Sequence, residues 1–467
     1  MNKSLSGIST TTTLAFTPEA FLTNSITLTN HAGRVVDIKS VVTDFTVTES
    51  IYMTAVGISL NIKDEVNMFE EMQLIGQEII TIDLVREDNL PAATRKTIKL
   101  TFYVAEYPLY SRMSDRMHLQ VYTITGISKH AYISQFKILS RAISGSTVSQ
   151  IQKILINDLD VPAKTITVIG DPISQFQGII PTMKPMDAIE WLRRRTYDKD
   201  GSPFYVFESV TGGIIIQSLS SMVKEKTNPL YATYTDSKAF DSEAISHEEY
   251  AQKAGRILEA SSSIKMSKIL SARSGAYASN NHYLDMSTKS YVVKIFDYNK
   301  HFNVQNTLEN KSTLSTKFKI KQFGINSEPV PLNKMWDASD SFIPLNILAY
   351  SADGTVNNYQ GMCRDHHDKN NAFTENLDTY IHDLHLFGDY TLNAGRRVKL
   401  RFPRAKDPTA DRDDTDRVND AKVFDNTFTG FYLVTSVIHK FSTGDGYFCD
   451  IRVKRDSLSF NLVYEEA

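Results

Sequence analysis

The sequence predicts an α+β protein that is mainly β, in which two antiparallel β-barrel units are combined with a small α+β domain and an irregular insertion. Three observations lead to this prediction. The chain has 467 residues, which is too long for one ordinary core and favours two to four domains. Hydrophobic and polar residues alternate in the N-terminal part with the period of a strand. Two distant stretches share one layout, which indicates an internal duplication.

Each copy of the duplication reads as a glycine turn, a strand, a long strand and a closing strand. The first copy comprises residues 73–84, 97–107 and 118–124, and the second comprises 391–402, 430–441 and 447–454. The copies are not built equally, because the charged stretch 403–417 separates the first two strands of the second copy. The second unit is therefore expected to differ from the first in detail.

The N-terminal part is expected to form the first β unit. Residues 1–20 are rich in Ser and Thr and are expected to be a flexible arm. Within 21–128, Ile58, Leu60 and Ile62 alternate with polar neighbours, which is typical of a strand with one buried face. The strands of this range are expected to close one antiparallel barrel or sandwich.

Residues 129–236 are expected to form the small α+β domain. Apolar residues from Val148 onward recur at helical spacing, and Pro162 would end that helix. Pro185 suits the first turn of a second helix. Two apolar runs around residues 211–213 then predict a hairpin.

The remainder is expected to form the second β unit, interrupted by an insertion. Strand patterns place this unit in residues 237–302 and 375–460, so it is discontinuous. Residues 303–374 are polar, weakly patterned and interrupted by Pro329, Pro331 and Pro344, and they are expected to be the insertion.

Bulk composition excludes several classes of function. The net charge of -3 gives no electrostatic basis for nucleic-acid or anionic-membrane binding. No apolar run is long enough to span a bilayer, and no signal peptide is recognisable at the N-terminus. Two cysteines, Cys363 and Cys449, provide no disulfide framework, which favours folding in a reducing cytoplasm.

Four segments resemble the central baseplate hub family of contractile-tailed phages, which includes the T-even hub and is related to the hubs of contractile injection systems. They are Ser-Ala-Arg-Ser-Gly-Ala-Tyr at 271–277, Asp-Ala-Ile-Glu-Trp-Leu at 187–192, the ending that runs from 392 to 440, and the opening at 44–52 with Ile-Gly-Gln-Glu at 75–78. Together they cover most of the chain in the family's order. None is a catalytic signature, and residues 303–371 have no counterpart.

The resemblance implies a structural protein without enzymatic activity or cofactors. Both β units would be similar to tail-tube barrels, and a homotrimer would present six of them around a channel that is sixfold in outline and threefold in detail. The implied partners are the trimeric tail spike, tail tube or tube-initiator proteins and the tape measure protein, with DNA passing unread. The implied location is the tail baseplate of a virion that is assembled in the host cytoplasm. Closed rings need a rotational operator, and paired strand edges would join neighbours.

A histidine-rich region offers the best alternative chemistry, a zinc site. Cys363 and His366, and likewise His382 and His385, have the internal spacing of zinc ligands. However, residues 382–387 lead into a strand, on which residues three apart point to opposite faces. The hub resemblance brings no zinc either, so we expect no metal here. A zinc-dependent or cell-wall hydrolase nevertheless remains the alternative from another functional class.

Other charged groups have simpler explanations. The run Arg193–Arg195 could contact phosphate, but it also complements the dipole at a helix end. Glu190 and Asp187 could act as paired acids, but packing explains their helix better. The carboxylates Asp411, Asp413, Asp414 and Asp416 lack the glycine and distal glutamate of a calcium loop.

Arg273 and Tyr277 are the candidate interface residues. Tyr and Arg are favoured at protein interfaces, while a turn stabilised by Gly275 explains the same segment equally well. The sequence therefore supports a baseplate hub first, the hub of a bacterial contractile injection system second, and a hydrolase third. A carbohydrate-binding tail module is suggested only by the β character and the many tyrosines.

Overall fold

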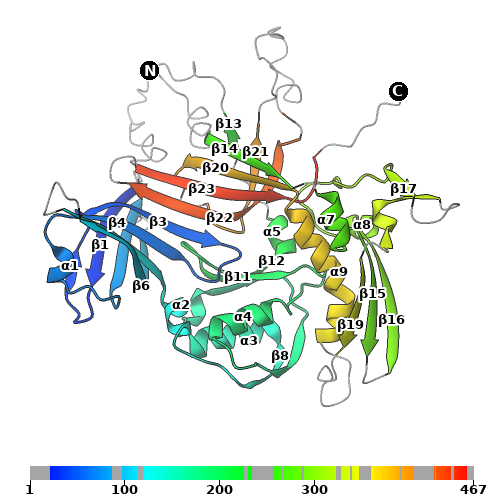
Figure 1. The fold of residues 1–467 in the computed structure, drawn as a ribbon, viewed down its shortest axis with the longest axis horizontal. Coiled ribbons are helices and arrows are strands. Elements are labelled where there is room, and N and C mark those ends of the chain that lie inside the picture. The colour runs from blue at the N-terminus through cyan, green and yellow to red at the C-terminus, as the bar shows by residue number, and fades with distance from the viewer. Residues whose placement is uncertain are drawn as a thin grey trace, which may run out of the picture.

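The structure, a computed structural model, is dominated by one large β-sheet (Figure 1). It describes residues 21–86, 97–112, 119–225, 230–233, 256–265, 267–285, 289–321, 328–336, 339–345, 359–389, 392–402, 425, 427–442 and 446–459. Within these residues the large sheet has the strand order β2-β1-β5-β6-β7-β4-β3-β22-β21-β13-β14-β20-β23. The mainly β, α+β class predicted from the sequence is therefore confirmed.

The strands of the N-terminal unit are β1 (Phe21–Thr29), β2 (Val35–Asp37), β3 (Val42–Ser50), β4 (Gly57–Asp64), β5 (Ile79–Arg86), β6 (Thr97–Arg112) and β7 (Gln120–Ser128). Inward and outward positions alternate along β4 and β7, and Ile58, Leu60 and Ile62 are buried as predicted. Each such side chain contributes roughly 1.5–3 kcal/mol through burial. The short helix α1 (Met68–Glu71) lies in the connection from β4 to β5.

The C-terminal unit closes on itself. Its strands are β13 (Leu230–Thr233), β14 (Arg256–Ile264), β20 (Tyr380–Phe387), β21 (Arg397–Arg401), β22 (Gly430–Ser442) and β23 (Gly446–Arg455). Pairing runs from β22 through β21, β13, β14 and β20 to β23, which pairs with β22 again. The C-terminal unit is thus a closed ring of six strands. It differs from the predicted antiparallel unit in β13, which comes from residues expected in the α+β domain and pairs in parallel with β14 and β21.

The N-terminal unit differs from the predicted barrel. In the part of the chain that the structure describes, its strands form an open sheet that runs from β2 at one edge to β3 at the other. The physical reason is that the free edge of β3 pairs with β22 of the other unit instead of returning to β2. One unit is closed, and the other is open and attached to it.

The predicted duplication corresponds to two matching antiparallel arrangements. In one copy β6 lies between β5 and β7, and in the other β22 lies between β21 and β23. The glycine turns also match, because Gly76 and Gly395 both have positive φ angles, of 89° and 84°. Glycine adopts this left-handed conformation without steric cost.

The α+β domain lies below the large sheet in Figure 1. Its elements are α2 (Lys129–Ser134), β8 (Ala142–Ser146), α3 (Thr147–Lys153), η4 (Ile154–Asp158), η5 (Ala163–Thr165), β9 (Ile166–Ile169), β10 (Gln175–Ile179), α4 (Pro185–Arg193), β11 (Phe204–Ser209), β12 (Gly213–Ser218) and α5 (Leu219–Val223). The first predicted helix ends before Pro162, Pro185 opens α4, and β11 and β12 form the predicted hairpin. Helices α3 and α4 pack with the strands around a core of their own.

A third group of elements differs from the prediction. Strands β15 (Ala278–Asp285) and β16 (Ser290–Asp297), which were expected in the second barrel, form a separate sheet with β19 (Asp340–Leu345) from the expected insertion. The other elements are α7 (Lys268–Arg273), α8 (Tyr298–Phe302), β17 (Lys319–Lys321), β18 (Pro329–Pro331), η7 (Leu332–Lys334) and α9 (Tyr359–Leu377). A strand period identifies strands but not their partners, which explains the difference.

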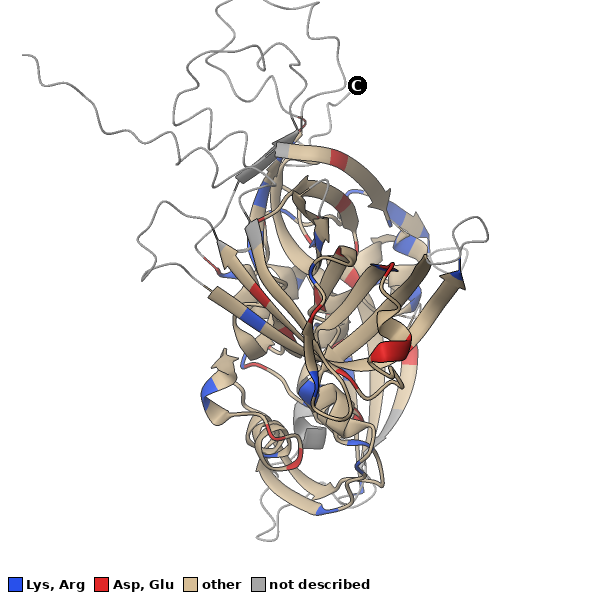
Figure 2. Cartoon of the chain, turned by 90° about the vertical axis from the view of Figure 1, so that its left-hand side faces the viewer, with Lys and Arg blue, Asp and Glu red and all other residues tan. Residues whose placement is uncertain are grey.

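Two expected features lie outside the described residues, namely the flexible arm 1–20 and the charged stretch 403–417 with its four aspartates. None of the described helices is long and apolar enough to cross a bilayer. Figure 2 shows basic and acidic residues interspersed over the described elements, without a face of one sign in that view.

Candidate functional site

The two β units are joined along a seam, which we define as the pairing of β3 with β22 from Ser50–Ser436 to Asp44–Ser442. One edge of β22 is divided, because its first residues pair with β21 and its last residues pair with β3. The other edge pairs with β23 along most of its length. Since β22 pairs with strands of both units, neither unit can move independently without breaking backbone hydrogen bonds.

Stacked aromatic rings cross the seam. The ring of Phe441 lies 4.5 Å from that of Phe45 on β3 and 4.5 Å from that of Tyr447 on β23, with interplanar angles of 14° and 12°. Such pairs contribute about 0.5–1.5 kcal/mol beyond their buried area. The hydrophobic core is continuous across the seam, because residues of both units belong to one cluster of buried side chains.

Truncation of the central ring should destabilise both units. Phe441→Ala is expected to lower the free energy of unfolding by about 3–5 kcal/mol, because it removes a buried ring and both stacking contacts. Urea denaturation measures the change. Phe318→Ala is the matched control, since Phe318 is exposed and should change the free energy by less than about 0.5 kcal/mol. Equal losses in the two variants would show that the stack does not stabilise the seam.

A buried carboxylate connects the seam to two other parts of the chain. Glu49 on β3 is fully buried, and it accepts hydrogen bonds from the backbone N–H of Val210 at 2.7 Å and of Ala394 at 2.6 Å. Val210 follows β11 of the α+β domain, and Ala394 precedes β21 of the closed ring. Burial raises the pKa of Glu49 to about 7, despite the opposing effect of these hydrogen bonds.

A second carboxylate supports the same junction. Glu208 on β11 accepts from the backbone N–H of Val56 at 2.8 Å and from the hydroxyl of Ser128. Its Oε2 also lies 3.9 Å from Nε2 of His130. Glu49 of the open sheet and Glu208 of the α+β domain thus each accept backbone hydrogen bonds from the other part, and together they fix the two parts against each other.

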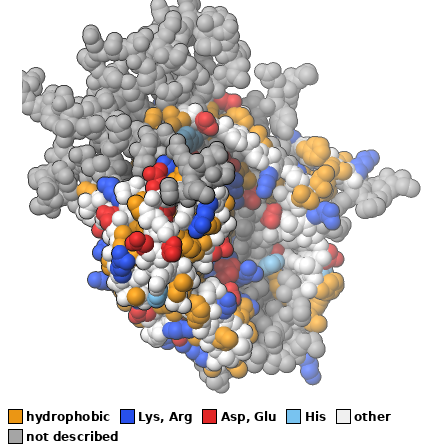
Figure 3. All heavy atoms as spheres, turned by 60° about the vertical axis from the view of Figure 1, so that its left-hand side comes forward, with side chains coloured by type: hydrophobic (Ala, Val, Ile, Leu, Met, Phe, Trp, Pro, Cys, Tyr) orange, Lys and Arg blue, Asp and Glu red, His pale blue; other side chains and the backbone are white. Residues whose placement is uncertain are grey.

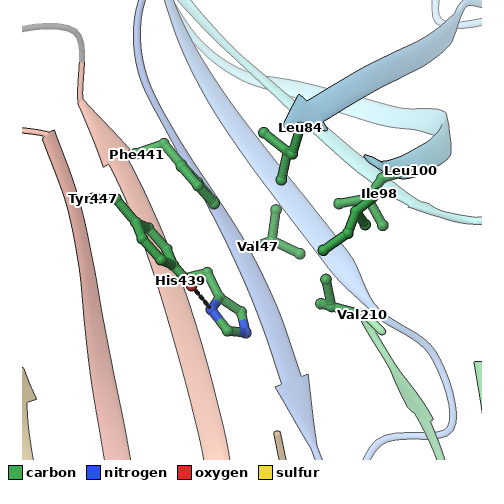
Figure 4. Close-up of a pocket in the computed structure, with 8 residues that line it drawn as sticks. All are labelled: Val47, Leu84, Ile98, Leu100, Val210, His439, Phe441 and Tyr447. Atoms are coloured by element: carbon green, nitrogen blue, oxygen red, sulfur yellow. Dashed lines mark hydrogen bonds between the residues drawn. The ribbon is translucent and has the colours of Figure 1, made fainter. Parts of the chain in front are cut away.

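A small hollow lies where the open sheet meets β22 and β23 (Figure 4). It is lined by Val47, Leu84, Ile98, Leu100, Val210, His439, Phe441 and Tyr447. Nδ1 of His439 is hydrogen-bonded to the hydroxyl of Tyr447 at 2.8 Å, and burial lowers the pKa of His439 to about 4. The hollow is apolar apart from this pair and offers no set of groups for catalysis.

The neighbouring thiol does not provide a nucleophile. Sγ of Cys449 lies 3.4 Å from Nδ1 of His439, which is the residue pair of a cysteine nucleophile and its base. However, Cys449 is fully buried, and burial raises the pKa of its thiol to about 12. Because the thiolate is the reactive form, this pair belongs to the core.

The four candidate zinc ligands occupy different environments. His382 is buried, with Nδ1 at 2.7 Å from the hydroxyl of Ser262 and Nε2 at 3.1 Å from that of Tyr432. His385 lies on the opposite face of β20, where Nδ1 is 2.6 Å from Asp450. The strand periodicity predicted this separation.

The other two candidates lie on α9. The ring centroids of His366 and Tyr197 are 6.0 Å apart, while the side chain of Cys363 is outside the described structure. Within the described residues, no three His, Cys, Asp or Glu side chains are grouped to hold a metal.

The two candidate interface residues also separate. Tyr277 is buried, its ring packs against Tyr298, and its hydroxyl accepts a hydrogen bond from Nζ of Lys268 at 2.9 Å. It therefore packs inside the chain and follows a turn in which Gly275 has a φ angle of 81°. Arg273, the last residue of α7, is exposed, and its role in an interface stays a prediction.

The three consecutive arginines are engaged within the α+β domain. Arg193 and Arg194 both pair with Glu190, at 2.5 Å and 2.8 Å, and Arg195 lies over the ring of Trp191. Glu190 is thus a partner of arginines and not of Asp187. Packing within the α+β domain, without a phosphate or a catalytic role, accounts for all of these contacts.

Among the solved structures that resemble the chain along most of its length are two tail proteins and a secretion-system component. The tail protein from Neisseria meningitidis MC58 aligns over 94% of this chain and 97% of its own, with 9% identity and a TM-score of 0.48. The 43 kDa tail protein of prophage MuSo2 from Shewanella oneidensis aligns over 94% and 100%, with 11% identity and a TM-score of 0.49.

A component of the E. coli type VI secretion system, described as structurally similar to T4 bacteriophage tail proteins gp27 and gp5, aligns over 91% of this chain and 76% of its own, with 11% identity and a TM-score of 0.35. No family model and no curated protein matches the sequence.

Glu49 is the site residue that sequence reasoning missed. The signal was present, because Phe45, Val47 and Glu49 share one parity in an alternating strand, and the first two are buried. A carboxylate at an inward position needs buried donors, which indicates a junction between parts of the chain. The donors themselves, Val210 and Ala394, were not predictable, because they are backbone groups of distant turns.

Proposed function

We propose that this chain is the structural hub of a phage contractile-tail baseplate, a homotrimer that joins the tail tube to the trimeric spike. The observation that carries the proposal is the duplicated strand arrangement, in which β5-β6-β7 and β21-β22-β23 are joined through the seam. A threefold ring of such chains carries six related arrangements, which matches a hexameric tube on one face and a trimeric spike on the other.

The difference between the units supports the same role. One unit is a closed ring of strands, and the other is an open sheet within the described residues. A trimer would therefore alternate two kinds of unit around its channel, sixfold in outline and threefold in detail. The seam fixes the angle between the units through backbone pairing, which suits an adaptor that must transmit force.

The resemblance of four sequence segments to baseplate hubs supports the choice of partners. These are the spike, the tail tube or its initiator and the tape measure protein, with DNA passing through the channel without being read. The protein would reside in the virion tail after assembly in the host cytoplasm. The hub of a bacterial contractile injection system is the alternative, and neighbouring capsid and terminase genes would favour the phage.

A non-enzymatic role is part of the proposal. His382 and His385, which a zinc hydrolase would use together, lie on opposite faces of β20 and make separate contacts. Elemental analysis of the purified protein gives a direct check, because stoichiometric zinc that disappears in Cys363→Ala would favour the hydrolase instead.

The mass in solution tests the ring. Light scattering should give three times the chain mass of 52.7 kDa for the purified chain alone, or that mass plus the mass of one spike trimer after addition of the spike protein. A monomer that persists at high concentration with the spike present would contradict the proposed hub.

A further inference from the structure

One face of the small sheet β15-β16-β19 is apolar and uncovered. Leu284, Tyr291, Val293, Ile295 and Phe342 are between 43% and 72% exposed. We call these five residues the sheet face. Their positions match in the register, because Tyr291 pairs with Leu284, while Val293 and Phe342 both pair with His282. Alternation along β16 therefore places Tyr291, Val293 and Ile295 outward, while Phe296 is buried on the other face.

The opposite face of this sheet is covered by α9. Asp368 on α9 accepts hydrogen bonds from Ser279 and Asn281 of β15, and all three residues are buried. An antiparallel sheet covered on one side normally carries polar residues on its other side. Here the outer side is apolar instead, so the sheet face is not explained by the packing of the chain itself.

The sheet face is also pre-ordered. The ring of His282 stacks on Phe342 at 4.5 Å and on Tyr291 at 5.7 Å, and Nε2 of His282 lies 2.9 Å from Asp340. A rigid, stacked aromatic surface loses little side-chain entropy when it binds a partner. Aromatic residues of this kind are enriched in the centres of interfaces.

The size of the sheet face suits a protein partner. Aromatic side chains bury about 150–250 Å² each, so five partly exposed apolar side chains present on the order of 500 Å². Soluble monomers rarely expose a contiguous apolar patch larger than a few hundred Å². A specific interface buries about 800 Å² per partner, so the sheet face would supply its centre and polar neighbours its rim. On the face shown in Figure 3, hydrophobic side chains are interspersed with charged ones, and one group of them lies near the right-hand edge.

A second set of exposed apolar side chains belongs to the α+β domain. Phe136, Ile138 and Ile179, beside α2 and β10, are 68% to 74% exposed, and we call them the α2 patch. Figure 1 shows α2 at the lower left and β15, β16 and β19 at the lower right, both below the large sheet. A ring of identical chains needs two different surfaces on opposite flanks, because each copy meets one neighbour on each side.

We propose that the sheet face of one copy packs against the α2 patch of the next copy in the ring. This inference rests on the proposed trimer and adds the surfaces through which its copies meet. The contact is heterologous, and a rotation of about 120° between neighbouring copies closes it at three copies, so that neither apolar patch stays exposed. Ring closure thereby explains why a single chain carries both patches.

Charge substitutions test the two patches separately. Ile295→Asp and Phe136→Asp should each weaken assembly at least about 30-fold and reduce the mass in light scattering toward that of one chain. Val304→Asp is the matched control, because Val304 is 83% exposed and belongs to neither patch. Circular dichroism establishes that each variant is folded. If wild type is trimeric and both patch variants remain trimeric, the assignment of surfaces is wrong while the proposed function stands.

Crosslinking tests the pairing itself. A full-length Phe136→Cys/Ile295→Cys variant in a Cys363→Ser background should give covalent trimers with a flexible bismaleimide, and neither single-cysteine variant should crosslink. Cys449 stays in place because it is fully buried. Dimers from Ile295→Cys alone would show that two sheet faces meet each other and would overturn the proposal. A wild-type protein that stays monomeric with the spike present would contradict both the proposed trimer and the proposed contact between its copies.

Discussion

Acidification from pH 7 to pH 4 is expected to remove about 3 kcal/mol of the free energy of unfolding for each of three buried histidines. Burial lowers the pKa values of His301, His382 and His439 from 6.5 to about 4. Because these values are depressed in the folded state, the unfolded state binds more protons between pH 6.5 and pH 4. Stability is therefore lost as the pH falls through this window, and the combined loss approaches the total stability of a typical domain.

A single substitution isolates one of these contributions. His439→Leu should be less stable than wild type at neutral pH, because the hydroxyl of Tyr447 loses its partner Nδ1. The difference between variant and wild type should then shrink by about 3 kcal/mol on acidification to pH 4, since leucine takes up no proton. Urea denaturation at a series of pH values measures it.

Tyr447→Phe is the control, because it removes the same hydrogen bond but keeps the imidazole. Its difference from wild type should be constant over this range, since burial raises the pKa of Tyr447 well above its usual value. A constant difference for His439→Leu as well would contradict the depressed pKa of His439.

Glu49→Gln should abolish a pH dependence of the free energy of unfolding that is opposite in sign to that of the histidines. Glu49 lies where β3, the α+β domain and the closed ring of strands meet. The folded-state pKa of Glu49 is raised from 4.5 to about 7, so the folded state binds the extra proton. The stabilising contribution is complete below pH 4.5 and is lost as the pH rises through 7, by about 3 kcal/mol. The variant cannot ionise, so the difference between wild type and variant should fall by that amount between pH 5 and pH 8.

Glu49→Ala separates the charge from the hydrogen bonds. It also cannot ionise, but it leaves the N–H groups of both Val210 and Ala394 without an acceptor, at about 1–3 kcal/mol each, whereas the glutamine variant keeps one acceptor oxygen for one of them. It should therefore be the less stable variant at every pH. A wild-type and Glu49→Gln pair that titrate in parallel would show that Glu49 is not the group responsible.

Local features of this fold were predictable from the sequence, and long-range pairing was not. The alternation of Ile58, Leu60 and Ile62 and the position of Pro185 gave the correct elements, because neighbouring residues determine them. The strand at Ser290–Asp297 was also apparent, but its partner was not. Backbone hydrogen bonds join groups that nearly every residue carries, so they do not depend on residue type. The sequence therefore did not indicate that β16 joins β15 in a separate sheet or that β3 joins β22.

Those features of the candidate site that follow from the two-residue period of a β-strand were predictable from the sequence. The opposite faces of His382 and His385 followed from their spacing on a strand, and Glu49 lay at an inward position of β3. The burial of Tyr277 did not follow, because its environment is formed by Lys268 and Tyr298 after the chain has folded back. The stack of Phe45, Phe441 and Tyr447 likewise depends on the seam.

The division of β22 has a consequence for the order of folding. The hydroxyl of Ser50 donates to the carbonyl of Thr435, which is synthesised 385 residues later. At a synthesis rate of about 5–20 residues per second, the edge of β3 stays unpaired for on the order of 20–80 s before β22 has been translated. An unpaired strand edge is a template for aggregation, so the nascent N-terminal sheet needs protection during this time. A chain that stops before Gly430 would keep this edge open permanently, so premature termination should give insoluble protein rather than a soluble half.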